Sequence, residues 1–108
     1  MRMFKPIPRN ALPDVMTVRE PLPSGEFGEP KLVAGVRFER TQSVVGDAHR
    51  TADAGAGTVF VDAVNSAGAF EVPAGSRVAI GGHSYFVRSC TRCEDLFGRV
   101  HHWEIEVG

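Results

Sequence analysis

A pair of adjacent glycines, Gly81 and Gly82, separates two short stretches of alternating apolar residues and constrains the fold of this chain more than any other feature. Both positions of a two-residue β-turn need positive φ, which glycine adopts without steric penalty. The pair therefore predicts a hairpin that joins Arg77–Ile80 to an antiparallel strand starting at His83. A further strand, Val100–Val107, follows a predicted loop at residues 94–98. We expect a three-stranded antiparallel meander in the last third of the chain.

Residues upstream of this meander show the period-two alternation of further β-strands. Met16 and Val18 would share the apolar face of the first strand, and Val36 and Phe38 that of the second. The predicted strands are residues 14–20, 32–40 and 58–64, with a short edge piece at residues 70–72. Since no stretch of about ten residues has a helical period, we predict an all-β fold, a small antiparallel β-barrel or sandwich of about six strands.

The size and composition of the chain limit its fold and its partners. Its 108 residues suit one domain, and 43% hydrophobic with 23% charged residues is typical of a globular protein. A formal net charge of −1 provides no general electrostatic attraction to nucleic acid. The sequence has no apolar run of about 18 residues, so no membrane partner is expected. The N-terminus lacks the apolar core of a secretory signal, and Cys90 and Cys93 are expected to be free thiols in a reducing compartment.

Residues 1–13 contain three prolines, which fix φ and remove backbone donors. We expect no helix here, and we predict an extended arm that precedes a single β-barrel domain at residues 14–108. The arm is either a frayed terminus or a segment that lies on a neighbouring subunit. In the second case, the predicted subunit-interface residues are the apolar side chains Met3, Phe4 and Ile7.

A second irregular segment, residues 43–57, is rich in glycine, alanine and small polar residues. It lacks the i, i+3, i+4 apolar pattern of an amphipathic helix. Loops of this length in compact domains are usually functional or disordered. One long flexible loop is therefore predicted between the second and third strands.

The cluster of side chains best suited to chemistry combines Cys90 and Cys93 with His101 and His102. Thiolates and imidazoles are zinc ligands, so these four residues are zinc candidates. Strand geometry argues against such a site. Residues three apart point to opposite faces of a sheet, and so do adjacent residues such as the two histidines. We therefore expect no metal and no other cofactor, and we interpret the thiols as small buried or half-exposed side chains.

His102 and Glu104 lie two residues apart and would share one face of the last strand. Such a pair can act in acid–base chemistry, but it is also typical of the solvated face of an antiparallel sheet. Trp103, Ile105 and Val107 would take the opposite, core-facing side. The sequence contains no nucleophile elbow, phosphate-binding loop, dinucleotide fingerprint or metalloprotease helix. These residues indicate a protein that is not an enzyme.

Four segments, taken in order, resemble the minor capsid proteins of tailed bacteriophages. They are K-P-I-P at residues 5–8, V-F-V-D-A-V-N-S at residues 59–66, G-S-R-V-A-I-G-G-H-S-Y-F-V at residues 75–87 and L-F-G-R-V-H-H-W-E-I at residues 96–105. Together they span most of the chain. The His-His-aromatic-Glu-Ile ending is the most specific of them.

The resemblance implies a virion structural protein of the head–tail connection, of the head-closure or stopper type. Such a protein would form a ring with copies of itself under the portal or adaptor protein and would dock the tail or tail-terminator protein. It would assemble in the host cytoplasm and reside at the head–tail interface of the virion. Its long loop would face the channel and contact packaged DNA. The loop residues implied here are Val44, Val45, Asp47, His49 and Arg50.

Two alternatives remain open. One is a tail-completion or tail-terminator protein of the same particle. The other is a small zinc- or nucleic-acid-binding β-barrel that uses Cys90, Cys93, His101 and His102.

Overall fold

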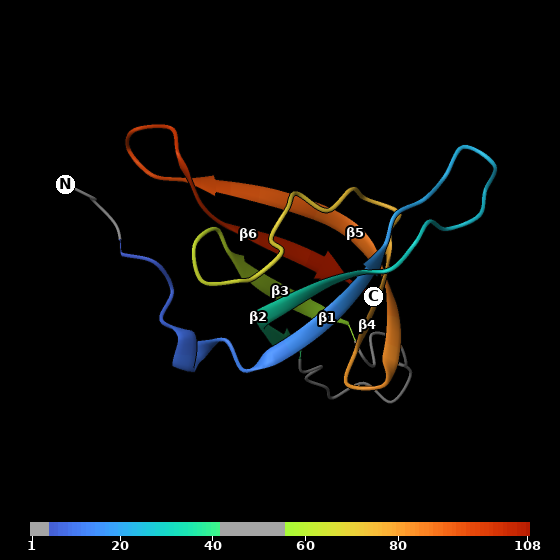
Figure 1. The fold of residues 1–108 in the computed structure, drawn as a ribbon, viewed down its shortest axis with the longest axis horizontal. Helices are drawn as coiled ribbons and strands as arrows, with labels where there is room; N and C mark the ends of the chain where they lie inside the picture. The colour runs from blue at the N-terminus through green and yellow to red at the C-terminus, as the bar shows by residue number, and fades with distance from the viewer. Residues whose placement is uncertain (1–4, 42–55) are drawn as a thin grey trace, which may run out of the picture.

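The computed structural model describes residues 5–41 and 56–108, and Figure 1 shows their arrangement. Six antiparallel strands in this part of the chain form a closed barrel in the order β1-β2-β3-β6-β5-β4, which confirms the all-β prediction. The strands are β1 (Asp14–Arg19), β2 (Lys31–Arg40), β3 (Gly57–Asp62), β4 (Arg77–Ile80), β5 (His83–Glu94) and β6 (Val100–Val107). In the same residues, no helix has the length and hydrophobicity needed to cross a lipid bilayer.

The C-terminal meander forms where the glycine pair predicts it. Ile80 pairs with His83 across the turn, and Gly81 and Gly82 adopt φ of 58° and 83°. This is the left-handed region that both positions of the turn require. β6 spans the predicted residues, whereas β5 extends into the first residue of the predicted loop.

Pairing between β1 and β4 closes the barrel, with Met16 opposite Ile80 in an antiparallel ladder. β5 pairs with two neighbouring strands because it is long. Its first half pairs with β4 and its second half pairs with β6. The register of the β5–β6 pair shifts between Val87 and Ser89, and Figure 1 shows β5 as a strongly curved strand. One continuous strand therefore belongs to two adjacent sides of the barrel.

The barrel interior is filled by aliphatic side chains from every strand. Met16 and Val18 of β1 are only 1% and 0% exposed, as their alternation predicts. Ile105 and Val107 of β6 are also buried, whereas Trp103 is half-buried against the core. Burial of one such aliphatic side chain stabilises a fold by about 1.5–3 kcal/mol. The other core residues are Val33, Val36, Val59, Val61, Val72, Val78, Ile80, Tyr85 and Val87.

A bulge in β2 brings Val33 and Val36, three residues apart, into the same core. Gly35 adopts φ of 78°, and the β1–β2 register shifts at this point. The extra residue of a bulge changes the face to which the following side chains point. Val36 and Phe38 both pack into the core as predicted, with the Phe38 ring centroid 5.3 Å from that of Tyr85. The inward position of Val33 is not predicted by simple alternation.

β3 ends at Asp62, two residues before the end that alternation predicts. Asp62 is fully buried, and its Oδ2 accepts hydrogen bonds from the N–H groups of Val64 at 2.9 Å and Asn65 at 2.7 Å. These bonds turn the chain out of the β-ladder. The predicted edge piece at residues 70–72 is also wrong, because these residues form no strand, although Val72 is buried in the core.

The described part of the N-terminal arm packs against the barrel of the same chain. Asp62 Oδ1 accepts the N–H of Ile7 at 2.9 Å, and Asn65 Nδ2 donates to the Ile7 carbonyl at 2.8 Å. Leu12 is 4% exposed. A single turn of 3-10 helix, Arg9–Ala11, lies between these contacts, so the expectation of no helix is wrong there. The turn forms because the residues between the prolines still supply backbone donors.

Replacing Asp62 with alanine should lower the free energy of unfolding by about 3 kcal/mol, because three backbone N–H groups around a buried site lose their acceptor. Urea denaturation of the variant and the wild type measures this difference. Asp95 provides a matched control, since its carboxylate accepts two backbone N–H bonds in an exposed loop. Asp95→Ala should cost less than about 1 kcal/mol. Equal losses of unfolding free energy in Asp62→Ala and Asp95→Ala would contradict the argument that burial makes the hydrogen bonds of Asp62 more costly to lose.

Candidate functional site

The loop between β5 and β6 carries two large apolar side chains on its outer surface. Leu96 is 70% exposed and Phe97 is 64% exposed. Asp95 holds the loop, because its Oδ1 accepts the N–H of Phe97 at 2.8 Å and that of Arg99 at 3.0 Å. The loop projects away from the barrel (Figure 1). Adjacent apolar side chains presented on an ordered turn are suited to contact with another protein.

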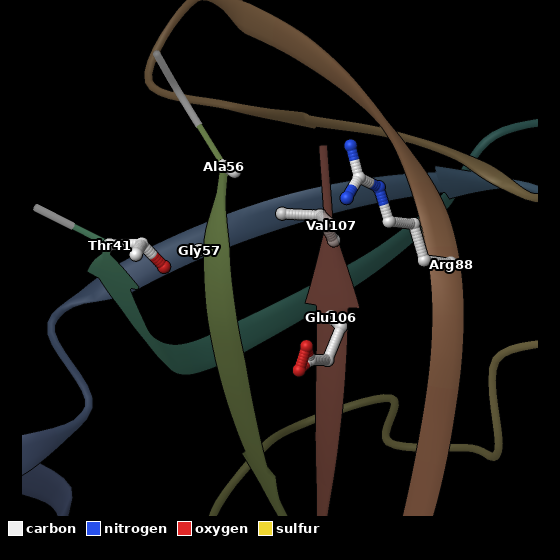
Figure 2. Close-up of a pocket in the computed structure, with 6 residues that line it drawn as sticks. All are labelled: Thr41, Ala56, Gly57, Arg88, Glu106 and Val107. Carbon is white, nitrogen blue, oxygen red and sulfur yellow. The ribbon is translucent and has the colours of Figure 1, made fainter. Parts of the chain in front are cut away.

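A shallow pocket of about 150 Å³ lies at the other end of β6, beside the residues that flank 42–55. There the N–H of Thr41 donates to the Ala56 carbonyl at 2.9 Å. Figure 2 shows Arg88 on β5 and Glu106 on β6 with their charged groups directed to different sides. Among the described residues, Arg88 forms no ion pair. The pocket therefore places a positive side chain near the base of this segment.

Most residues predicted for the subunit interface and the channel lie outside the described residues. These are Met3 and Phe4 of the arm and Val44, Val45, Asp47, His49 and Arg50 of the loop. Ile7 is described, and it is half-buried with its N–H and carbonyl both bound to the barrel of its own chain. The assignments of these residues to an interface or a channel stay predictions.

A cluster of polar side chains lies where β5 ends and β6 begins. Cys93 of β5 pairs with His102 of β6, and Glu104 follows on the same face. His102 Nε2 lies 2.9 Å from Glu104 Oε2, and Cys93 Sγ lies 3.7 Å from the same oxygen. The prediction that His102 and Glu104 share a face is confirmed. Cys90 does not join the cluster, because it packs against the hydrophobic core.

The two adjacent histidines meet instead of pointing to opposite faces. The Nδ1 atoms of His101 and His102 are 2.8 Å apart, so this part of the prediction is wrong. The reason is a shift of the β5–β6 register between Cys93 and Glu94, which places one extra residue, His101, in β6. His101 Nε2 lies 2.6 Å from the Lys5 carbonyl oxygen. A chain of hydrogen bonds therefore runs from the arm through both histidines to the cluster.

Both thiols are free, as predicted, and neither is activated as a nucleophile. Burial raises the pKa of Cys90 above its ordinary value. Burial, followed by the negative charge of Glu104, raises the pKa of Cys93. Catalytic thiols have a lowered pKa, so these environments are unlike those of a cysteine nucleophile.

The sequence does not single out Arg88, Leu96 or Phe97. The nearest signal for the last two is their position in a short segment between two predicted strands, where aspartate and glycine indicate a turn. The position of Arg88 beside the base of residues 42–55 depends on the curvature of β5, for which the local sequence carries no signal.

Comparison with known protein families supports the resemblance seen in the sequence. A family model described as "Minor capsid protein" matches residues 24–107, which include β2 to β6 completely. No curated protein and no solved structure matches the chain. The family match covers well over half of the 108 residues and confirms the relationship to phage minor capsid proteins. The chain therefore belongs to the minor capsid protein family, whose members are structural proteins of the bacteriophage virion.

Proposed function

We propose that this minor capsid protein is a head-closure connector that forms a ring under the portal or adaptor protein and docks the tail. The observation that carries the proposal is the exposed pair Leu96 and Phe97, an apolar contact element held in place by Asp95. Family membership supports the role in the virion. The position at the head–tail interface is our proposal. The proposed role requires neither catalysis nor a cofactor.

The closed barrel favours binding through loops. A sheet with a free edge can add a strand from another chain, but each described strand is paired on both sides. Contacts within a ring, and contacts to the portal or tail, would then use side chains on loops and on the outer surface. Leu96 is the most exposed large apolar residue described. Phe97 beside it has the size and shape of the aromatic anchors that contribute most to protein interfaces.

The N-terminal arm meets the barrel close to the same loop. The Lys5 carbonyl contacts His101 near the start of β6, and Figure 1 shows the arm and the β5–β6 loop on the same side of the barrel. Met3 and Phe4 directly precede Lys5 in the sequence. The arm and the loop would therefore contribute to one contact surface, for a neighbouring subunit or for the portal.

The opposite end of β6 is the proposed channel side. Residues 42–55 connect to the barrel at Thr41 and Ala56, next to Arg88. Since Arg88 has no ion pair among the described residues, its guanidinium is available to a phosphate group. With His49 and Arg50 it would contact packaged DNA. These are few positive groups for one chain, but a ring repeats them in every subunit, which multiplies the electrostatic attraction to DNA.

Replacing Leu96 and Phe97 together with serine should weaken binding to the portal ring of the same phage at least about tenfold, because each apolar side chain loses about 1.5–3 kcal/mol of burial. The melting temperature should change little, since both side chains are exposed. Native mass spectrometry of mixtures with the portal measures the binding.

Leu32→Ser is the matched control for this double variant. Leu32 is 62% exposed on β2, and its replacement should leave portal binding unchanged. If the control weakens binding as much as the double variant does, the β5–β6 loop has no special role. If the wild-type protein binds the tail tube and not the portal, the result supports the tail-terminator alternative.

Deleting residues 1–4 should reduce assembly on the portal while leaving the barrel stable. The deletion removes Met3 and Phe4 but retains the hydrogen bonds of Ile7 to the barrel. A deletion of residues 1–13 would not separate the two effects, because it also removes the buried Leu12. Sedimentation velocity measures assembly, and thermal denaturation measures the fold. Unchanged assembly by a stable variant would remove the arm from the proposed interface.

A further inference from the structure

We infer that Cys93, His102 and Glu104 form a binding site for a divalent transition metal ion, with Zn²⁺ the ion that best suits their donor atoms. One thiol sulfur, one imidazole nitrogen and one carboxylate oxygen from these residues lie within 4.8 Å of one another. This set differs from the four candidates that the sequence suggests, because Cys90 and His101 are not among the ligands and Glu104 is added. The site also departs from the expectation that the protein has no cofactor.

Two strands bring the three donors together. Cys93 and His102 are cross-strand partners in the β5–β6 ladder, and Glu104 lies two residues further along the same face of β6. The Sγ–Oε2 distance between Cys93 and Glu104 is 3.7 Å, and the Nε2–Oε2 distance between His102 and Glu104 is 2.9 Å. Around a tetrahedral Zn²⁺, neighbouring ligand atoms lie about 3.3–3.6 Å apart, as its bond lengths require. The separation between Cys93 Sγ and the His102 ring nitrogen lies within 4.8 Å, so the Cys93 side chain would rotate toward His102 to reach that geometry.

The hydrogen-bond chain through the two histidines leaves the lone pair of His102 Nε2 directed at Glu104. The Lys5 carbonyl oxygen can only accept, so His101 Nε2 carries the proton of that 2.6 Å hydrogen bond. In neutral His101 the Nδ1 atom then accepts from the N–H at His102 Nδ1. Neutral His102 is left with an unprotonated Nε2, which faces the carboxylate of Glu104.

His102 Nε2 and Glu104 Oε2, 2.9 Å apart, are both suitable ligand atoms for a divalent cation placed between them. The same cation would bind the Cys93 sulfur as a thiolate, with release of the thiol proton to solvent.

The surroundings have the features of a metal site beyond the three ligands. Histidines that bind metals commonly donate their second N–H to a fixed acceptor, which orients the ring, and His101 provides that acceptor for His102. His101 is in turn held by the carbonyl of Lys5. A cavity of about 270 Å³ lined by Cys93, Glu94, His101 and His102 adjoins the site and leaves room for water as a fourth ligand.

The donor types select among metal ions. Calcium and magnesium prefer sites made of oxygen atoms, whereas a thiolate and an imidazole favour zinc and neighbouring transition metals. We therefore expect Zn²⁺ and Co²⁺ to bind and Mg²⁺ not to compete at similar concentrations. A bound ion would link β5 to β6 at the base of the exposed loop and, through His101, would hold the arm in the same place.

The test uses the full chain, treated with a chelator, dialysed and titrated with Zn²⁺ by isothermal titration calorimetry. We expect one ion per chain for the wild type. Cys93→Ser and His102→Gln should each lower the association constant at least about tenfold. Cys90→Ser is the matched control, because it removes the same group three residues away on the same strand, and it should bind like the wild type.

Titration with Co²⁺ gives a readout that depends on metal binding by the Cys93 thiolate and that a purely structural role of Cys93 would not change. Thiolate coordination produces a sulfur-to-cobalt charge-transfer absorption, which the wild type and Cys90→Ser should show and Cys93→Ser should lack. Circular dichroism checks that all variants are folded. The proposal is overturned if the wild type binds no stoichiometric Zn²⁺, or if Cys93→Ser binds as tightly as the wild type. Equal losses in the two serine variants would also overturn it, since they would implicate the set that includes Cys90.

Discussion

The buried carboxylate of Asp62 is the interaction on which one end of this barrel depends. Its two oxygens bind the arm at Ile7 and the turn that follows β3, and its own N–H donates to Ser66 Oγ at 2.8 Å. Ser66 Oγ in turn donates to the carbonyl of Gly35 in the β2 bulge. A buried carboxylate is costly unless its acceptors are filled, so each of these segments must keep its position for the others to be stable. The end of β3, the bulge and the docked arm thus form a cooperative unit.

Local sequence signals were enough to predict the strands that follow the period-two rule without interruption. Gly81 and Gly82 determine the β4–β5 turn by their backbone conformation alone, and β6 keeps a regular register from His102 to Val107. The signals fail where a residue is positioned by a partner distant in sequence. The bulge at Gly35 can be recognised only once Ser66 is known to lie against it. Asp62 fits the alternating pattern of β3, and only its hydrogen bonds in the folded structure show that it ends the strand.

The candidate sites show the same limit. Alternation correctly places His102 and Glu104 on one face, but the proximity of Cys93 depends on the β5–β6 register, which only the folded barrel provides. The bulge at His101 then reverses the expected direction of that side chain. Exposure of Leu96 and Phe97 follows from barrel closure, because the same two residues could have covered a core in another arrangement of the strands. The barrel fold would not by itself indicate a role in the virion, which comes from family membership.

Closure of the barrel also determines how the molecule would respond to mechanical load. An open sheet can be peeled from its edge one hydrogen bond at a time, whereas here every described strand is held by two ladders that must break together. The ladders are unequal in length. β4 has only four residues, and it is joined to β1 and to β5 by four residue pairs each. Under tension we expect the barrel to open first at β4, while the longer β5–β6 ladder keeps the exposed loop and the arm together.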